Sequence, residues 1–158
     1  MGNIIALDPA TKFGVSSFTA DGKHRESASI SLKKYPLRWG GFHDELSSFL
    51  KKYNENGEVV DLLVIEEPII FRARSPNFIS PQLCGIAFAI AETMKIPYIT
   101  ANNKTVKKWA TGSGNAGKPE IMEEARRRAP GVDVKDDNQA DAILLALWAI
   151  FCVEFEKN

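Results

Sequence analysis

The stretch NIIALDPATKFGVSSFTADG, residues 3–22, decides the fold class of this chain. Its apolar run Ile4-Ile5-Ala6-Leu7 predicts a buried strand over residues 3–8, which the following proline ends. After a short turn, residues 13–19 predict a second strand. The dipeptide Asp21-Gly22 is typical of a hairpin turn, so we expect a third strand at residues 25–32. The chain therefore opens with an antiparallel meander of three strands.

The rest of the chain alternates between helical and strand patterns. Residues 62–65 form a continuous apolar run, which is typical of a strand buried on both faces of a parallel sheet. The predicted helices are residues 37–53, 81–94, 105–110, 118–128 and 138–155, and the later strands are residues 62–65 and 97–100. This order predicts an α/β fold with a mixed five-stranded sheet, the antiparallel meander plus parallel strands, and helices on both faces. All 158 residues, 1–158, should form a single domain.

The composition is that of an ordinary globular protein, with 44% hydrophobic and 25% charged residues. No apolar stretch is long enough to span a bilayer and no leader is evident, so we expect a cytoplasmic protein without a membrane partner. Cys84 and Cys152 lie in apolar surroundings, and we expect both to be buried, reduced thiols.

Three carboxylates stand where packing alone would not place them. Asp8 and Glu66 each end an apolar strand, and Asp141 lies inside the apolar pattern of the last helix. The carboxyl ends of parallel strands meet at one sheet edge, so Asp8 and Glu66 should emerge side by side. Clustered, buried carboxylates need a cation, and hard oxygen ligands suit Mg²⁺ or Mn²⁺. Two such ions can hydrolyse a phosphodiester without a histidine base.

Two details of this site stay open in the sequence. Strand phase does not decide whether Glu66 or Glu67 points into the site. Asp137 and Asn138 lie about one turn before the acid of the last helix, so either can share its face. The alternative is that Asp137, or its neighbour Asp136, caps the helix.

The formal net charge is zero, so any binding to nucleic acid has to rely on local basic patches. Basic residues concentrate in predicted loops and helix starts near the acidic edge, where they can hold phosphates without reading base sequence. The predicted DNA contacts of this kind are Arg72, Arg74, Lys104, Lys107, Lys108 and Lys118. The alternative for each is an ordinary solvated charge. We keep that alternative for Arg126, Arg127 and Arg128, which neighbour glutamates.

Residues 112–118, GSGNAGK, match the pattern of a phosphate-binding P-loop. Pro119 follows where a P-loop has Ser or Thr, and a helical pattern precedes the segment instead of a strand. We therefore predict no nucleotide cofactor and interpret the segment as a flexible loop that closes on DNA. Pro119 suits the first turn of the helix after it.

Several motifs together resemble those of the RuvC family of Holliday-junction resolvases. In chain order they are Ile4-Ile5-Ala6-Leu7-Asp8-Pro9, Val64-Ile65-Glu66-Glu67, Thr105-Val106-Lys107, Gly112-Ser113-Gly114-Asn115-Ala116-Gly117-Lys118 and Ala140-Asp141-Ala142. The resemblance implies an RNase H-like fold, a homodimer and magnesium-dependent nicking of branched DNA such as a four-way junction. It makes Asp8, Glu66 and Asp141 metal ligands, and it links Lys107 and Lys118 to DNA binding and catalysis.

The chain departs from the family pattern at three positions. Ala10 stands where the family usually has glycine, and Asn138 stands where it has Asp or His, so the fourth ligand is Asn138 or Asp137. The aromatic residue expected after the glutamate is Ile69 here, which leaves nearby Phe71 as the aromatic DNA contact. Such divergence resembles a phage or prophage member, acting in a bacterium or a phage-infected host cell.

We therefore predict a metal-dependent, structure-selective endodeoxyribonuclease that resolves Holliday junctions or related branched DNA by two-metal hydrolysis. The predicted cofactor is a pair of Mg²⁺ ions, for which Mn²⁺ can substitute, and Lys118 would stabilise charge on the scissile phosphate. Two other interpretations stay open. One is an RNase H-like nuclease acting on RNA, and the other is a non-catalytic module that binds branched DNA.

Overall fold

The computed structural model describes residues 2–68 and 79–154, so the predicted DNA contacts Phe71, Arg72 and Arg74 lie outside the described residues. The order of the elements is the predicted one. The strands are β1 (Asn3–Asp8), β2 (Lys12–Thr19), β3 (His24–Ser31), β4 (Val60–Glu66) and β5 (Tyr98–Ala101). The helices are the short 3-10 helix η1 (Leu32–Lys34), α1 (Arg38–Glu55), α2 (Ile79–Thr93), α3 (Asn103–Thr111), α4 (Lys118–Arg128) and α5 (Asp137–Cys152).

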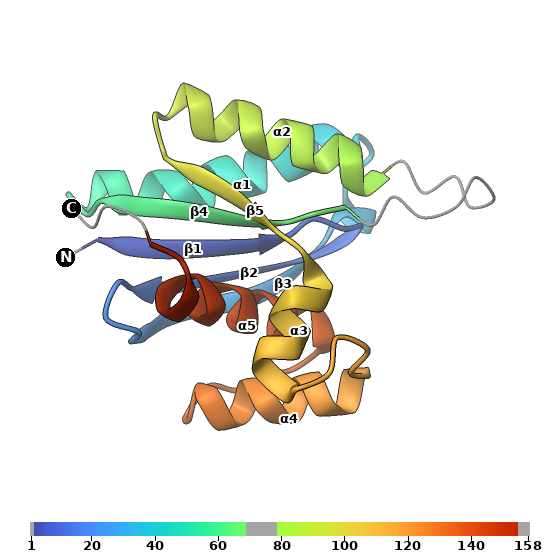
Figure 1. Cartoon of the computed structure of the whole chain (residues 1–158). Coiled ribbons are helices and arrows are strands. Elements are labelled where there is room, and N and C mark those ends of the chain that lie inside the picture. Colours follow the sequence, from blue (N-terminus) through green and yellow to red (C-terminus); the bar gives the residue numbers. More distant parts are fainter. Residues whose placement is uncertain (1, 69–78, 155–158) are drawn as a thin grey trace.

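The strands form one mixed sheet in the order β3-β2-β1-β4-β5. β2 pairs antiparallel with both β1 and β3, whereas β4 pairs parallel with β1 and β5. The prediction of a meander extended by parallel strands is thus confirmed. β1 lies at the centre of the sheet, and its carboxyl end is next to that of β4 (Figure 1).

Side chains of the central strands alternate between two apolar cores. One core lies beneath α3, α4 and α5 and takes Ile4, Ala6, Phe18, Leu62 and Val64 from the sheet. The other lies beneath α1 and α2 and takes Ile5, Leu7, Phe13, Leu63 and Ile65. Figure 1 shows the corresponding helical layers, with α1 and α2 on one face and α3, α4 and α5 on the other. Because both faces are covered, every residue of β1 is buried.

The helices carry the two cysteines of the chain, and only one of them is buried. α5 ends at Cys152, and this cysteine is exposed, so the prediction of a buried thiol is wrong there. Cys84 in α2 is buried and free, as predicted, and its Sγ lies 3.7 Å from the Glu66 carbonyl oxygen. In the part of the chain that the structure describes, no helix is long and apolar enough to cross a membrane.

Candidate functional site

Asp8 and Glu66 lie at the neighbouring carboxyl ends of β1 and β4. Asp8 continues the alternation of Ile4 and Ala6, and Glu66 continues that of Val64, so both carboxylates belong to the α5 side of the sheet. Strand phase in the structure therefore favours Glu66 over its neighbour. The sequence could not reveal this phase because residues 62–65 are all apolar and show no alternation of polar and apolar positions.

Glu67 has a different set of partners. Its carboxylate accepts a hydrogen bond from Thr100 Oγ1 at 3.2 Å, and its backbone N–H donates to Ala101 O at 2.9 Å. Both glutamates still line a cleft of about 190 Å³ at this edge. The cleft is formed by Asp8, Pro9, Ala10, Glu66, Glu67, Pro68 and Ser80. Within this cleft, Glu66 is the glutamate whose charge raises the pKa of Asp8.

The helix α5 packs directly against β2, beside Asp8. Gly14 pairs with Asp8 across the sheet, and a Cβ built at Gly14 would overlap the carbonyl oxygen of Asn138. Ser16 Oγ donates a hydrogen bond to Ala142 O at 2.6 Å and holds the next turn of the helix. These contacts bring the acids of α5 to the end of β1. The sequence analysis missed them, although glycine inside a strand often marks a close backbone approach.

Asp136, and not Asp137, caps α5. The Asp136 carboxylate accepts a hydrogen bond from Gln139 N at 2.9 Å and pairs with Lys12 Nζ at 2.7 Å. Asp137, the first residue of the helix, instead forms an ion pair with Lys118 Nζ at 2.9 Å. The charge of Asp137 also raises the pKa of Asp8 and that of Asp141, so Asp137 belongs to the acidic group.

Burial and repulsion from neighbouring acids raise the pKa values of two residues of this group, Asp8 and Asp141. Burial raises the pKa of Asp8 well above its ordinary value, and Glu66 raises it further by its charge and by a carboxyl–carboxyl hydrogen bond. Burial also raises the pKa of Asp141 to about 7, and Glu66 adds to this shift while Lys107 and Lys118 oppose it. The ionised forms are therefore short of positive charge, which a bound cation would supply.

Protein donors occupy several carboxylates of the site. Asn103 Nδ2 donates a hydrogen bond to Glu66 Oε1, and Lys118 holds Asp137. Among residues 2–68 and 79–154, no three His, Cys, Asp or Glu side chains are arranged to hold a metal ion. The chemistry of the donor set nevertheless fits Mg²⁺ or Mn²⁺, since the ligands are hard carboxylate oxygens, and the pKa values of Asp8 and Asp141 are raised. An ion that binds Asp137 has to compete with the ion pair between this carboxylate and Lys118.

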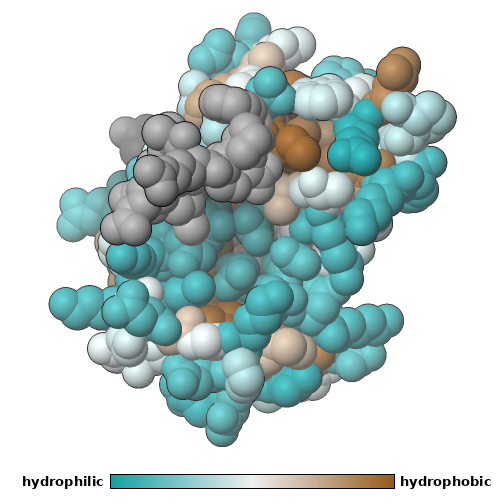
Figure 2. Space-filling view, turned by 90° about the vertical axis from the view of Figure 1, so that its right-hand side faces the viewer, coloured by the Kyte–Doolittle hydropathy of each residue, from teal (hydrophilic) through white to brown (hydrophobic). Residues whose placement is uncertain are grey.

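Four of the predicted basic contacts lie beside this edge. Lys104, Lys107 and Lys108 lie on α3, and Lys118 is the first residue of α4. Lys107 and Lys118 both lower the pKa of Asp141 by their charge, so these two lie near the acidic group, and Lys104, Lys108 and Lys118 are exposed. Figure 2 views the molecule from the carboxyl ends of β1 and β4, and this face is largely hydrophilic.

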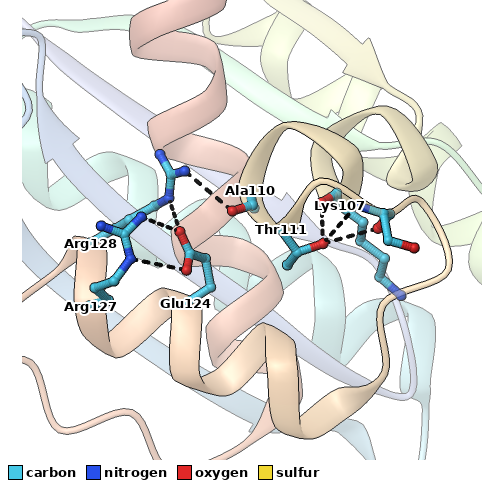
Figure 3. Close-up of polar contacts among 7 residues, drawn as sticks. Lys107, Ala110, Thr111, Glu124, Arg127 and Arg128 are labelled. Carbon is cyan, nitrogen blue, oxygen red and sulfur yellow. Dashed lines mark hydrogen bonds and ion pairs between the residues drawn. The ribbon is translucent and has the colours of Figure 1, made fainter.

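Arg128 holds α4 against the end of α3 (Figure 3). Its Nε donates to Glu124 Oε1 at 2.6 Å, its Nη2 donates to Ala110 O at 3.3 Å, and its guanidinium lies 4.1 Å from the centre of the Trp109 ring. Arg127 pairs with the same glutamate at 2.5 Å from the exposed side. The interpretation of Arg128 as a solvated surface charge is therefore wrong, because it joins the two helices that carry the lysines.

The loop between α3 and α4 is closed by its own hydrogen bonds. Gly112 ends α3 in the left-handed conformation with φ of 83°. Thr111 Oγ1 accepts a hydrogen bond from Ser113 N at 3.2 Å, and Glu120 accepts one from Gly117 N at 3.3 Å (Figure 3 shows the Thr111 contacts). These bonds lie at the two ends of the loop, so its predicted flexibility is not tested by them. Its closing on DNA stays a prediction.

Comparison with known proteins agrees with the architecture and with the motifs. Two proteins named crossover junction endodeoxyribonuclease RuvC are similar to the chain over nearly its whole length. The protein of Gluconobacter oxydans is 23% identical over 154 residues, which cover 93% of this chain and 89% of the relative. The protein of Granulibacter bethesdensis is 25% identical over 151 residues, which cover 91% of this chain and 82% of the relative. No protein-family model matches the chain.

A solved structure supports the same assignment of the fold. The structure of Thermus thermophilus RuvC in complex with a Holliday junction substrate matches with a TM-score of 0.75. The match covers 93% of this chain and 92% of the RuvC chain at 17% identity. The fold is RNase H-like, as predicted. Both along nearly the whole sequence and in fold, the chain is similar to RuvC.

Proposed function

We propose that this protein is a metal-dependent, structure-selective endodeoxyribonuclease that resolves Holliday junctions or related branched DNA. One observation carries the proposal: Asp8, Glu66 and Asp141, from three different elements, interact at one edge of the sheet in a RuvC-like chain. A fold alone does not define an activity, so the acidic group has to supply the argument. Its burial without matching positive charge is what a cation-dependent site requires.

Asp8, Glu66 and Asp141 would hold the metal ions by their carboxylate oxygens. Two Mg²⁺ ions, for which Mn²⁺ can substitute, supply an activated water and charge neutralisation at the leaving oxygen when bound. By holding the ions in place, the three acids would determine where the reacting phosphate binds. The pairing of β1 with β4 keeps Asp8 and Glu66 together. Cleavage would leave 5′-phosphate and 3′-hydroxyl ends.

Asp137 is the favoured fourth ligand. Its charge acts on Asp8 and on Asp141, so its carboxylate lies within reach of the same group. The backbone of Asn138 packs on Gly14 and serves to dock the helix. Replacing Asp137 by Asn should therefore weaken Mg²⁺-dependent cleavage at least tenfold, while Asn138→Ala should change it less. Equal losses in the two variants would contradict this assignment.

The lysines beside the acidic group would hold the phosphate backbone. Lys118 pairs with Asp137, and release of its ammonium from that pair would let it stabilise charge on the scissile phosphate. Lys107, whose charge lowers the pKa of Asp141, would contact a neighbouring phosphate. Lys104 and Lys108 extend this basic surface along α3, and Phe71, Arg72 and Arg74 stay predicted contacts outside the described residues.

A homodimer is part of the proposal, with α2 as the contact surface. This helix buries one face against the sheet but leaves Gln82, Gly85 and Ala89 exposed on the other. Small residues at helical spacing allow a second helix to approach closely, and two sites in one assembly suit a substrate with paired strands to cut. Action in the cytoplasm of a bacterium or infected host, and an origin in a phage or prophage, stay predictions.

The test is cleavage of labelled four-way junctions by purified protein in Mg²⁺. We expect paired nicks in the junction, little cutting of linear duplex, and loss of both in EDTA and in Asp8→Asn. Cleavage that survives Asp8→Asn would contradict the site, and equal cutting of linear duplex would contradict the structure selectivity.

The same assay separates the other two interpretations. Preferential cutting of RNA or of an RNA–DNA hybrid would favour the RNase H-like nuclease. Tight junction binding in EDTA with no cleavage in Mg²⁺ or Mn²⁺ would favour a non-catalytic binding module. Asn102→Ala, which alters the cap of α3 outside the acidic group, serves as the folded control in each arm.

A further inference from the structure

We infer that Asn103 is a positioning residue for Glu66, which orients this carboxylate to receive a divalent cation. The inference rests on the proposed function of the acidic group. Its basis is the hydrogen bond from Asn103 Nδ2 to Glu66 Oε1, which neither the motifs nor the basic pattern of the sequence indicated. An ionised carboxylate only accepts hydrogen bonds, so the amide must present its nitrogen and not its oxygen to Glu66.

The backbone fixes where Asn103 lies. Glu66 pairs directly with Ala101 across β4 and β5, and Asn102 alone joins β5 to α3. Asn102 Oδ1 caps the helix by accepting a hydrogen bond from Lys104 N at 3.0 Å. Asn103 is then the first helical residue, two positions after the residue paired with Glu66. Because strand pairing fixes the chain before Asn103 and a capped helix fixes it from Asn103 onward, the backbone holds Asn103 beside Glu66.

The chemistry of this contact differs from that of the other contacts in the acidic group. Lys118 neutralises Asp137 with a full positive charge, so a metal ion would have to compete with it. Asn103 is neutral and engages Oε1 of Glu66, so it leaves the negative charge of this carboxylate for a cation. A neutral donor that orients a ligand without replacing the metal is the common arrangement around metal-binding carboxylates.

Asn103 can be tested separately from the stability of α3 because the cap belongs to Asn102. Asn103→Ala and the similarly shaped Asn103→Leu remove the donor to Glu66 and leave the cap. Asn102→Ala removes the cap and leaves the donor. A merely structural role for this segment would make the three variants behave alike.

The experiment is a titration of the full chain with Mg²⁺ alone, and separately with Mn²⁺, by isothermal calorimetry without DNA. We expect Asn103→Ala and Asn103→Leu to weaken metal binding by about tenfold or more, and Asn102→Ala to leave it unchanged. In junction cleavage, the Mg²⁺ concentration for half-maximal rate should rise by a similar factor, and saturating Mg²⁺ should restore most of the maximal rate.

Two results would overturn the inference, and they are distinguishable from failure of the proposed function. Wild-type binding constants in Asn103→Ala, or an equal weakening in Asn102→Ala, would show that Asn103 does not position Glu66. The proposed function itself fails if the wild-type chain does not bind Mg²⁺, or if Asp8→Asn binds Mg²⁺ as well as the wild-type chain does. The inference then fails with it.

Discussion

Acidic side chains at this edge of the sheet lie next to one another, although ionised carboxylates prefer solvent or a positive partner. Asp8 is buried and Asp141 is partly buried next to other acids, which favours their protonated forms in the folded chain. Gly14 is the residue that allows this crowding, because its missing Cβ lets α5 reach the end of β1. Stability given up at such positions is the usual mark of a functional site.

The raised pKa of Asp141 predicts a specific dependence of stability on pH in the absence of metal. The folded pKa is about 7 and the ordinary value is 3.8, so the stabilisation from this group is fully present below about pH 4 and is lost as pH rises through 7. Asp141→Asn should therefore flatten the curve and stabilise the chain near pH 8, by at most about 4 kcal/mol. Urea unfolding in EDTA at several pH values measures this.

Asp133→Asn is the control for that experiment, since this acid is exposed. Its pH dependence should follow that of the wild-type chain. Parallel curves for Asp141→Asn and wild type would show that Asp141 ionises in the folded chain as it does in the unfolded one.

Gly14→Ala tests the close approach of α5 to β2. The added Cβ has no room beside the Asn138 carbonyl, so the first turn of α5 must shift, at an expected loss of about 1–3 kcal/mol. Because Asp137 and Asp141 move with that turn, junction cleavage should fall by about 10²-fold. Gly40→Ala is the matched control, since Gly40 lies in α1 with open space around it, and it should stabilise the chain by about 0.5–1 kcal/mol. A neutral effect of Gly14→Ala would contradict the docking argument.

Whole elements bring the separate residues together. β1 and β4 supply two acids because they are adjacent and parallel, and α5 supplies the others because it crosses the face of β2. α3 and α4 form a second unit, which carries Asn103, Lys107 and Lys118 and is joined by Arg128. The site therefore depends on how these two units pack.

Arg128→Ala should separate α3 from α4. Its side chain is only 25% exposed and contacts Glu124, the Trp109 ring and Ala110 O, so its loss should lower the free energy of unfolding by about 1–3 kcal/mol. Arg127→Ala, which removes a partner of the same glutamate from the exposed side, should change stability much less than Arg128→Ala. Urea unfolding compares the two variants, and similar losses in both would contradict the role given to Arg128.

The elements were predictable from sequence to a larger extent than the contacts between them. Alternating or continuous apolar residues identify the strands, and the acids stand at strand ends where a sheet edge gathers them. The choice of Glu66 over Glu67 depends on which face of the sheet each residue of β4 occupies. A run that is apolar at every position does not reveal this. Asn103 and Gly14 were missed because each acts on a residue far away in the sequence, and no local pattern reports such a contact.

At the scale of the whole molecule, one face combines the cleft, the lysines and the acidic group. The chain carries no net charge, so this local concentration of basic residues has to provide the attraction for DNA. Figure 2 shows that face as largely hydrophilic, whereas α2 runs along the face of the sheet that α1 also covers (Figure 1). Dimer contact and DNA contact can therefore coexist.

Ala89→Glu tests the proposed dimer. A charge at this exposed position of α2 should prevent the close approach of a second helix and leave a monomer of 17.5 kDa, while the wild-type chain should sediment at about twice that mass. Analytical ultracentrifugation measures both. Ser48→Glu, at an exposed position of α1, should not change the assembly. A monomeric wild-type chain, or a dimeric Ala89→Glu, would place the contact elsewhere or exclude it.

The order in which the acids occur along the chain has a consequence during translation. Asp8 and Glu66 leave the ribosome early, but Asp141 lies on α5, the last helix that the structure describes. Contacts between distant segments, such as Ser16 with Ala142, also form late in folding. A nascent chain on the ribosome, or a fragment from interrupted synthesis, would thus hold two of the three acids and remain harmless to the DNA around it.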